Sequence, residues 1–255
     1  MYKPVLMLLS LNAELLLALC MFLGAVLYTS VGHAGASAYI AMMALFSVPA
    51  VVMRPTALVL NILVASFTSF RFIKAGLFRF RTLWPFLVGA LPMAFLGGYI
   101  QLPGEFYRPL VGVVLLIAAV RLLWPSELRS NRESSDPPLW LAVLAGAVIG
   151  LLSGLTGTGG GIFLSPLLLF LAWSETRTAS GVAAVFILCN SVAGLLGNIA
   201  SVKSLPPDLP LFAAAVLLGA VIGTTLGISK LAQQGVLKAL GLVLIVAGFK
   251  LIGAY

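Results

Sequence analysis

The sequence predicts an all-α polytopic membrane protein that contains two inverted repeats of about five hydrophobic segments each. Of its 255 residues, 61% are hydrophobic and only 9% are charged, and the mean hydropathy is +1.14. Soluble domains average about 45–50% apolar and about 25% charged residues. The composition therefore excludes a soluble domain, and apolar segments recur along the whole chain.

Ten apolar segments account for most of the chain. They lie near 5–31, 36–49, 55–73, 83–101, 107–124, 138–156, 160–173, 178–200, 209–228 and 235–254. Eight of them reach the roughly 20 residues that a membrane-spanning helix requires. The segments 36–49 and 160–173 are too short to cross a bilayer at about 1.5 Å per residue. Each follows a glycine-containing break, so we expect two short, tilted or re-entrant helices beside eight full-length ones.

A weak internal repeat relates the two halves of the chain. Placing each position over the one 124 residues later aligns 31–43 with 155–167 without a gap and pairs Gly35 with Gly159. The break and the short segment that follows it therefore fall at matching points in both halves. Agreement over all five segments of each half favours a duplication, although identity between the halves is low.

Charge predicts the orientation of the repeats. The loop at 71–81 carries four basic residues, which is typical of a cytoplasmic loop. The longest polar run, residues 125–137, is expected to be a cytoplasmic linker between a first membrane repeat, 1–124, and a second, 138–255. If each half crosses the membrane five times, an odd number, the two halves are inverted relative to each other and both chain ends face outward. The net charge of +8 does not indicate a nucleic-acid partner, because Arg71, Lys74, Arg79 and Arg81 sit together between two apolar segments, as in a cytoplasmic loop.

The second break is the most informative segment of the sequence. Four glycines fall within Gly157–Gly161, and each would cost a helix interior roughly 1 kcal/mol. A break at membrane depth is tolerated only where the freed backbone groups are buried in protein or line a wet cavity. The helix that follows would begin with unpaired N–H groups and a positive dipole end, which together attract an anion. The alternative is that these glycines only allow close helix packing.

These segments resemble the sulfite/sulfonate exporter family of TauE/SafE type, also called the toluene sulfonate uptake permease family. The resemblance covers essentially the whole chain and is carried by GLTGTGGGIFLSPLL at 154–168 and TASGVAAVFILCNSVAGLLGN at 178–198. The matching stretch of the first half, VGHAGASAYIAMM at 31–43, departs from the family's glycine-rich form. The resemblance implies a multi-pass carrier of small sulfur-containing anions, such as sulfite, sulfonates or sulfoacetate, in the bacterial cytoplasmic membrane. It leaves the exact anion and the direction of transport open.

Residues at the two breaks, with polar residues on nearby helices, are the candidates for binding the anion. They are His33, Gly35, Ala36, Ser37, Ser66, Gly157, Thr158, Gly159, Gly160, Gly161, Asn190 and Ser191. As the chain's single histidine, His33 could bind the anion as a cation, carry a coupled proton, or cap the broken helix as a neutral donor. Asn190, which the repeat pairs with Ser66, could line the pathway or only hydrogen-bond a neighbouring helix.

Two arginines precede the helices that follow the short segments, one in each half. Arg54 and Arg177 could draw anions toward the site, or they could anchor the helix ends at the membrane interface. Glu14 is a further candidate for a coupled proton, although its place near the chain start equally suits an interfacial position.

Other function classes lack the residues that they need. The sequence has one histidine, no clustered metal ligands and no Walker-type phosphate loop, so we expect no enzyme activity, catalytic residue, metal or cofactor. The expected partners are a small anion, with a proton or cation as a coupled ion, and the lipid bilayer, while the oligomeric state stays open. The alternatives are an anion channel, which could use the same helix dipoles, and a carrier of a non-sulfur organic anion.

Overall fold

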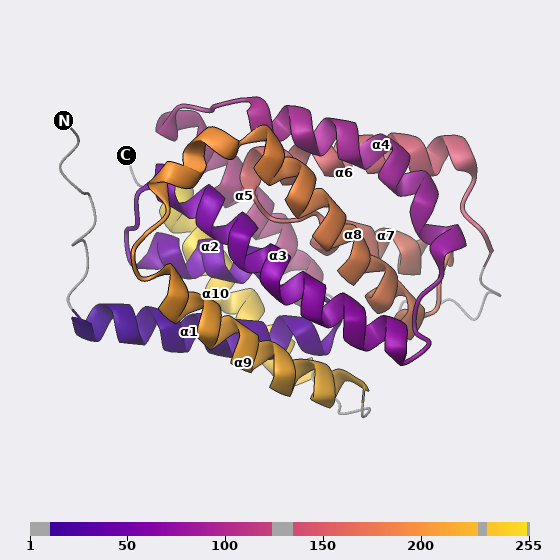
Figure 1. Ribbon diagram of the computed structural model, residues 1–255, viewed down its shortest axis with the longest axis horizontal. Coiled ribbons are helices and arrows are strands. Elements are labelled where there is room, and N and C mark those ends of the chain that lie inside the picture. The colour runs from indigo at the N-terminus through magenta and orange to yellow at the C-terminus, as the bar shows by residue number, and fades with distance from the viewer. Residues whose placement is uncertain (1–10, 124–134, 229–233, 254–255) are drawn as a thin grey trace.

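The computed structural model describes residues 11–123, 135–228 and 234–253, and these residues are predominantly helical (Figure 1). Over them the chain forms ten α-helices and one short 3₁₀-helix. They are α1 (Leu11–Ser30), α2 (Ala36–Leu45), α3 (Ala50–Lys74), α4 (Phe80–Tyr99), α5 (Gly104–Leu123), α6 (Leu139–Thr156), α7 (Gly161–Phe170), α8 (Thr176–Gly197), η1 (Ile199–Ser204), α9 (Leu209–Ile228) and α10 (Gln234–Gly253).

Each predicted apolar segment forms a helix, and the two short ones are α2 and α7, with 10 residues each. Six described helices are long and apolar enough to cross a membrane: α1, α3, α4, α6, α8 and α9. The helices α5 and α10 extend over 20 residues each but are not among these six. The class predicted from composition, a multi-pass helical membrane protein, is confirmed at this level.

Two helix starts differ from the prediction. The helix α3 begins at Ala50 and α8 at Thr176, so Arg54 and Arg177 lie within these helices and not before them. Arg54 is tolerated inside an apolar helix because its guanidinium donates hydrogen bonds to carbonyl oxygens at the end of α4. Arg177 is exposed in the first turn of α8.

Glycines spaced four residues apart pack two pairs of helices closely. On α6, Gly150 and Gly154 face the Ala90 and Ala94 carbonyls of α4, with no room for a Cβ atom at either glycine. Because the numbers rise together, α4 and α6 run in the same direction. Small residues at this spacing let helix backbones approach closely in membranes.

The helices α1 and α9 form the matching pair. Gly223 and Gly227 of α9 face the carbonyls of Val26 and Ser30 on α1, so these two helices are also parallel. In contrast, α3 and α8 are antiparallel, because a Cβ on Gly194 of α8 would contact the Leu58 side chain near the start of α3. The contacts of the glycines in α5 and α10 show that these two helices are antiparallel as well.

The short helix α2 lies deep in the molecule. All of its residues from Ala36 to Ala44 are buried, and it packs against α1, α3 and α10. The other short helix, α7, packs chiefly against α8. The helix α2 is therefore enclosed by the long helices, whereas α7 is only partly covered and its last residue, Phe170, is exposed.

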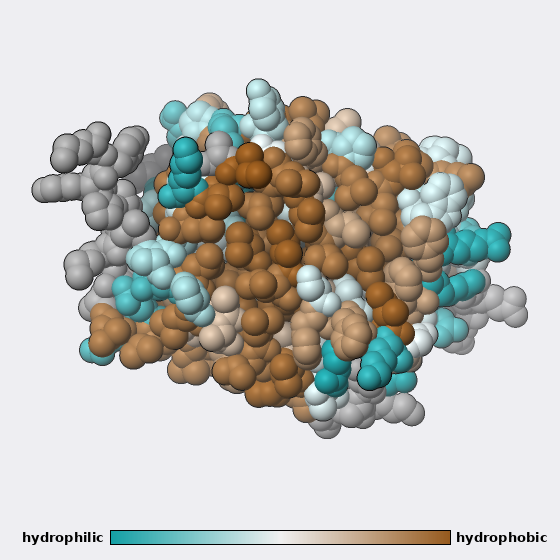
Figure 2. Space-filling model, viewed as in Figure 1, coloured by the Kyte–Doolittle hydropathy of each residue, from teal (hydrophilic) through white to brown (hydrophobic). Residues whose placement is uncertain are grey.

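The surface of the bundle fits a membrane environment. Figure 2 shows hydrophobic side chains across the middle of the visible face, with hydrophilic ones gathered toward its left and right ends. Figure 1 places the start of α1 and the end of α10 at the left, and the turn between α3 and α4 at the right. A salt bridge of 3.0 Å between Arg81 Nε and Asp136 Oδ2 joins the start of α4 to the residues that precede α6.

Candidate functional site

Both predicted helix breaks are present. The first break, residues 31–35, separates α1 from α2, and the second break, residues 157–160, separates α6 from α7. Gly35 and Gly160, which cap the starts of α2 and α7, have φ values of 99° and 78°. This left-handed conformation costs a residue with a side chain roughly 1–2 kcal/mol, so glycine suits both positions.

The two breaks meet inside the bundle. The Nε2 atom of His33, in the first break, lies 3.0 Å from the carbonyl oxygen of Gly161 at the start of α7. Only 3% of the His33 side chain surface is exposed. Two segments from opposite halves of the sequence therefore contact each other directly in a buried position.

A small cavity of about 10 Å³ lies between the breaks. It is lined by Tyr28, His33, Ala34, Gly35, Ala36, Ser37, Asn61, Thr158, Ile162 and Ile187. This volume is close to the minimum that a single water molecule needs. The described conformation is therefore closed around the breaks, and an anion of several atoms would require them to move apart.

The starts of both short helices contribute backbone donors to this region. The first hydrogen bonds of α7 run from Phe163 N and Leu164 N to Gly160 O, and α2 begins with Tyr39 N bonded to Gly35 O. The N–H groups that come before these have no acceptor within their own helix. Each helix start also carries the positive end of a dipole. Two positive helix ends therefore converge on one buried region.

Side chains around His33 complete the first half of the site. His33 Nδ1 lies 3.1 Å from the Val31 carbonyl oxygen, and the Tyr28 ring meets the imidazole edge-on with 6.1 Å between centroids. Ser37 donates a hydrogen bond of 2.7 Å to the Tyr28 hydroxyl. The start of α2 is thereby tied to the end of α1 across the first break.

The second break packs against polar side chains of α3 and α8. Asn61 Nδ2 donates to Ser191 Oγ at 2.9 Å, and a Cβ on Gly159 would collide with that amide. A Cβ on Gly160 would lie 2.9 Å from Asn190 Nδ2. Asn61, Asn190 and Ser191 are all 0% exposed.

Asn190 is the most unusual of these polar groups. Within the described residues, neither its Oδ1 nor its Nδ2 has a hydrogen-bond partner, and Asn61 Oδ1 has none either. A buried polar group without a partner costs about 1–3 kcal/mol. Hydrogen-bonding capacity is therefore left unused next to the glycines of the second break.

Most of the predicted binding residues are brought together. His33, Gly35, Ala36, Ser37 and Thr158 line the cavity. Gly161 touches His33, while Gly159 and Gly160 contact the amides of the two asparagines, and Ser191 joins them through Asn61.

Gly157 lies against the backbone of Arg54, at a different point of the second break. Ser66 is not brought to the site. It is exposed on α3, and its hydroxyl donates to the Ile62 carbonyl of its own helix at 2.7 Å.

The two arginines predicted to recruit anions occupy different surroundings. Arg54 is 5% exposed, and its guanidinium donates to the carbonyl oxygens of Gly97, Gly98 and Ile100, which end α4. It therefore caps a helix C-terminus in this conformation. Arg177 lies exposed at the start of α8.

Two contributors to the site were not identified from the sequence. Tyr28 is not among the predicted binding residues, although the polar run Tyr28-Thr29-Ser30 at the end of an apolar helix is a signal for a functional helix end. The role of Asn61 cannot be decided from the sequence, because a lone asparagine in an apolar run equally suits the transport pathway and a hydrogen bond between helices. Among the described residues, no group of three or more His, Cys, Asp or Glu side chains is placed to hold a metal ion.

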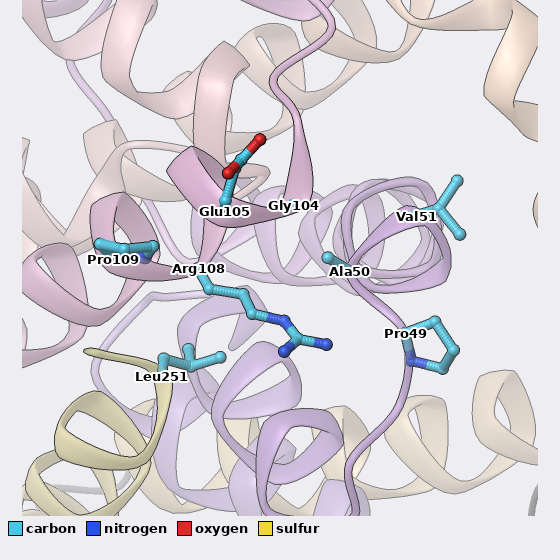
Figure 3. Close-up of a pocket in the computed structure, with 8 residues that line it drawn as sticks. All are labelled: Pro49, Ala50, Val51, Gly104, Glu105, Arg108, Pro109 and Leu251. Carbon is cyan, nitrogen blue, oxygen red and sulfur yellow. The ribbon is translucent and has the colours of Figure 1, made fainter. Parts of the chain in front are cut away.

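A larger cavity of about 380 Å³ lies elsewhere, where the starts of α3 and α5 approach the end of α10 (Figure 3). In Figure 3, the Arg108 side chain extends toward α3, whereas Glu105 points away from it. None of the predicted anion-binding residues lines this cavity. Because it lacks the helix breaks and every predicted anion-binding residue, we assign the candidate site to the smaller cavity.

Buried helix breaks inside a bundle of membrane-spanning helices define a multi-pass membrane transporter, and comparisons with known proteins agree. The sequence pattern described as sulfite exporter TauE/SafE matches residues 17–251, and the chain belongs to this family. It is also 39% identical over 240 residues to the probable membrane transporter protein y4hK of Sinorhizobium fredii (strain NBRC 101917 / NGR234). That alignment covers 92% of this chain and 97% of the relative. No solved structure matches the chain.

Proposed function

We propose that the protein is a secondary transporter that moves small sulfur-containing anions, such as sulfite, sulfonates or sulfoacetate-like compounds, across the bacterial cytoplasmic membrane. The observation that carries this proposal is the meeting of the two breaks, with His33 Nε2 3.0 Å from Gly161 O and both short-helix starts beside it. The sulfur chemistry is supported by membership of a family described as sulfite exporters.

Backbone N–H groups at the two helix starts would hold the anion. A hydrogen bond to a charged acceptor is roughly twice as strong as a neutral one, and a sulfonate or sulfite group offers three oxygens. Donors from α2 and α7 could reach different oxygens of the same group. The unpaired amide of Asn190 supplies a further donor beside the second break. This arrangement needs no lysine or arginine held permanently in the membrane core, which would cost about 2.5 kcal/mol or more.

Inverted repeats, 1–124 and 138–255 joined by the linker 125–137, are part of the proposal. They are supported by the directions of the helices. The helix α3 and its equivalent in the second half, α8, run in opposite directions, and α9, which is parallel to α1, also runs opposite to α8. The first helices of the two halves are α1 and α6, and α6, which is parallel to α4, runs in the direction opposite to α1. Inverted repeats with broken helices that meet near the midplane are typical of secondary transporters.

Orientation follows from the charges. The Arg81–Asp136 salt bridge puts the loop at 71–81 and the end of the linker at one end of the bundle. The loop at 71–81 is strongly basic and the linker contains Arg129 and Arg132, and we place both in the cytoplasm.

Alternating access is supported by how the buried apolar side chains divide. One cluster is formed mainly by α1, α2, α3, α5, α9 and α10, and a second cluster by α4, α6, α7 and α8. His33 lies between α1 and α2, which contribute to the first cluster, and Gly161 begins α7, which contributes to the second. Movement of one cluster against the other would separate the two breaks and open the 10 Å³ cavity to one side of the membrane.

The first experiment is a thermal unfolding assay of the purified protein with sulfite, thiosulfate, sulfoacetate, isethionate, taurine, sulfate and acetate. A ligand stabilises the folded state by RT ln(1 + [L]/Kd), so millimolar concentrations reveal even weak binding. We expect a shift with the sulfur oxyanions that is lost in Asn190→Leu and kept in Ser66→Ala, the residue that the repeat pairs with Asn190. An equal shift with acetate would contradict the sulfur assignment, and no shift with any anion would contradict the site.

Conductance measurements distinguish the transporter from an anion channel. We expect reconstituted protein to exchange labelled sulfonate across vesicles without single-channel currents. Discrete currents carried by the same anions would contradict alternating access and favour a channel, which could use the same helix dipoles.

A further inference from the structure

We infer that Arg54 closes the outer entrance of the anion path, and that its guanidinium becomes the counter-charge of the anion when this entrance opens. This inference rests on the proposed function and adds to it a charged residue that selects anions on one side of the membrane.

Arg54 is the one buried aspartate, glutamate, lysine or arginine in the part of the chain that the structure describes. Its guanidinium donates hydrogen bonds of 2.7 and 2.9 Å to the carbonyl oxygens of Gly98 and Ile100, and a further one to that of Gly97. Its Nε atom is also buried and has no hydrogen-bond partner among the described residues. A charged side chain inside a membrane bundle is costly and usually marks an ion or substrate pathway.

The helices α1 and α2 form a hairpin with the first break at its tip. A Cβ on Gly24 of α1 would contact the Met42 side chain of α2, and nearer the break the Ser37 hydroxyl donates to the Tyr28 hydroxyl. The two helices are therefore antiparallel, and α2 returns to the end of the bundle where α1 starts and α10 ends (Figure 1). This end is opposite the basic loop at 71–81, so we place it outside.

The helices α6 and α7 form a second hairpin that enters from the other end. The backbone N–H of Ser135 donates to the Ala172 carbonyl at 3.0 Å, so the residues after α7 lie beside those that precede α6. The Arg81–Asp136 salt bridge joins the same segment to the start of α4, at the end that we place in the cytoplasm. The second break is therefore the tip of a hairpin that points outward.

This outward-pointing tip packs against Arg54. A Cβ on Gly157 would lie 3.2 Å from the Arg54 carbonyl oxygen and 3.3 Å from its Cγ atom. The next residue of the break, Thr158, lines the small cavity, and so does Asn61, two turns further along α3. Because α3 begins at the outer end, Arg54 lies between that end and the cavity.

The tip of the first hairpin makes the corresponding contact toward the cytoplasm. A Cβ on Gly32 would lie 2.5 Å from both the Cβ atom and the carbonyl oxygen of Ser180, near the start of α8. The Ser180 hydroxyl donates to the Thr176 carbonyl of its own helix at 3.1 Å. The inner contact is thus made by two uncharged residues, whereas the outer contact contains a buried cation.

Opening of the outer entrance would release this cation. The helix α3 belongs to the first apolar cluster and α4 to the second, so the bonds from Arg54 to the end of α4 join the two parts that we propose to move. A buried charge that loses its partners is strongly unfavourable. A sulfonate or sulfite that enters from outside can replace the carbonyl oxygens, because the guanidinium fork suits oxyanions and binds them with charge-assisted hydrogen bonds. The closed conformation needs no anion, since the carbonyls already occupy Arg54.

Thiol labelling tests the charge of the entrance. The two natural cysteines are replaced in the full chain, Cys20→Ala and Cys189→Ala, and Thr158→Cys is introduced next to the tip as the probe. Two reagents of similar size but opposite charge are compared: sulfonatoethyl methanethiosulfonate, which is an anion, and trimethylammonioethyl methanethiosulfonate, which is a cation. Each rate is divided by the rate of the same reagent with a free thiol. Intact cells expose the outer side, and inside-out membrane vesicles expose the inner side.

From outside, we expect the anionic reagent to react faster in these relative units. The ratio of anionic to cationic rates should fall about fivefold or more in Arg54→Gln, because one charge attracts the first reagent and repels the second. Arg54→Lys keeps the charge and is the matched control, with the preference retained. From inside, Arg54→Gln should leave the ratio unchanged, since basic residues of the cytoplasmic loop act equally in both variants.

Exchange of labelled isethionate by the wild type in vesicles separates this inference from the proposed function. An outside ratio that is the same with and without Arg54→Gln would overturn the role of Arg54, and the proposed function would stand if isethionate is still exchanged. Absence of exchange would overturn the proposed function and the inference with it. If Arg54→Gln does not fold, equal relative rates of the two reagents from outside, with Arg54 intact, would still overturn the inference.

Discussion

Asn61 on α3 donates a hydrogen bond of 2.9 Å to the Ser191 hydroxyl on α8, directly against the backbone of Gly159. This bond joins one helix from each half of the chain at the level of the second break. Both side chains are fully buried, so neither can exchange this partner for water. The pair therefore holds the two halves together where the proposed site lies.

We expect Asn61→Ala and Ser191→Ala to be coupled in a double-mutant cycle. Hydrogen bonds between membrane helices contribute on average about 0.6 kcal/mol and at most about 1.7 kcal/mol in such cycles. An interaction energy in this range, from unfolding of the single and double variants in detergent, would agree with the structure. Strict additivity would mean that the bond contributes nothing to stability.

Replacing Asn190 by leucine should separate stability from binding. Leucine has the same branched shape as asparagine but no polar atoms, so it removes two unpaired buried groups. We expect the free energy of unfolding to rise by about 1–3 kcal/mol while the anion-induced thermal shift disappears. Ser66→Ala is the matched control and should change neither quantity. A marked loss of stability in Asn190→Leu would indicate that the amide has a structural partner.

Arg54→Met should destabilise the protein strongly. The substitution leaves the carbonyl oxygens of Gly97, Gly98 and Ile100 without their charged donor. Hydrogen bonds to charged groups contribute about 1.5–3 kcal/mol, and we expect a loss of at least this size in detergent unfolding. The control Arg79→Met, at an exposed arginine directly before α4, should stay within about 0.5 kcal/mol. If Arg54→Met unfolds like the wild type but takes up anions more slowly, Arg54 serves in recruitment.

Gly150→Ala should loosen the packing of α6 on α4. Its new methyl group would collide with the Ala90 carbonyl, and overpacking of this kind typically costs about 1–3 kcal/mol. The control is Gly104→Ala at the start of α5, where an added Cβ meets no atom within 4 Å. We expect the melting temperature to fall only in the first variant. Equal melting temperatures would contradict the close contact between α4 and α6.

The breaks could be predicted from the sequence because glycine clusters interrupt apolar segments locally. An inverted repeat also predicts that the two breaks approach each other, but the particular contact between the His33 ring and the Gly161 carbonyl could not be predicted, because it joins residues 128 positions apart. The place of Arg54 was missed for the same reason, since its acceptors belong to another helix. A charged side chain is visible in a sequence, but its partners are not.

The sequence also does not show which face of each helix is buried. The repeat alignment pairs Ser66 with Asn190, yet Ser66 is exposed, and it is Asn61, earlier on the same helix, that reaches α8. In a soluble helix, alternation of polar and apolar residues shows which side is buried. Both sides of α3 are largely apolar, because one faces protein and the other suits lipid. The pattern therefore does not show how the helix is rotated about its axis, that is, which side faces the protein. Only the structure distinguishes the two asparagines from the serine.

The parallel packing of α1 on α9 has a consequence for biosynthesis. The partner that covers this face of α1 belongs to the far end of the chain, and translation at about 5–20 residues per second would produce it roughly 10–40 s after α1 leaves the ribosome. During that interval α1 is a membrane-inserted helix whose final neighbour does not yet exist. The same holds for α4 until α6 is made. Neither half can therefore mature before the other, and assembly must wait for the complete polypeptide.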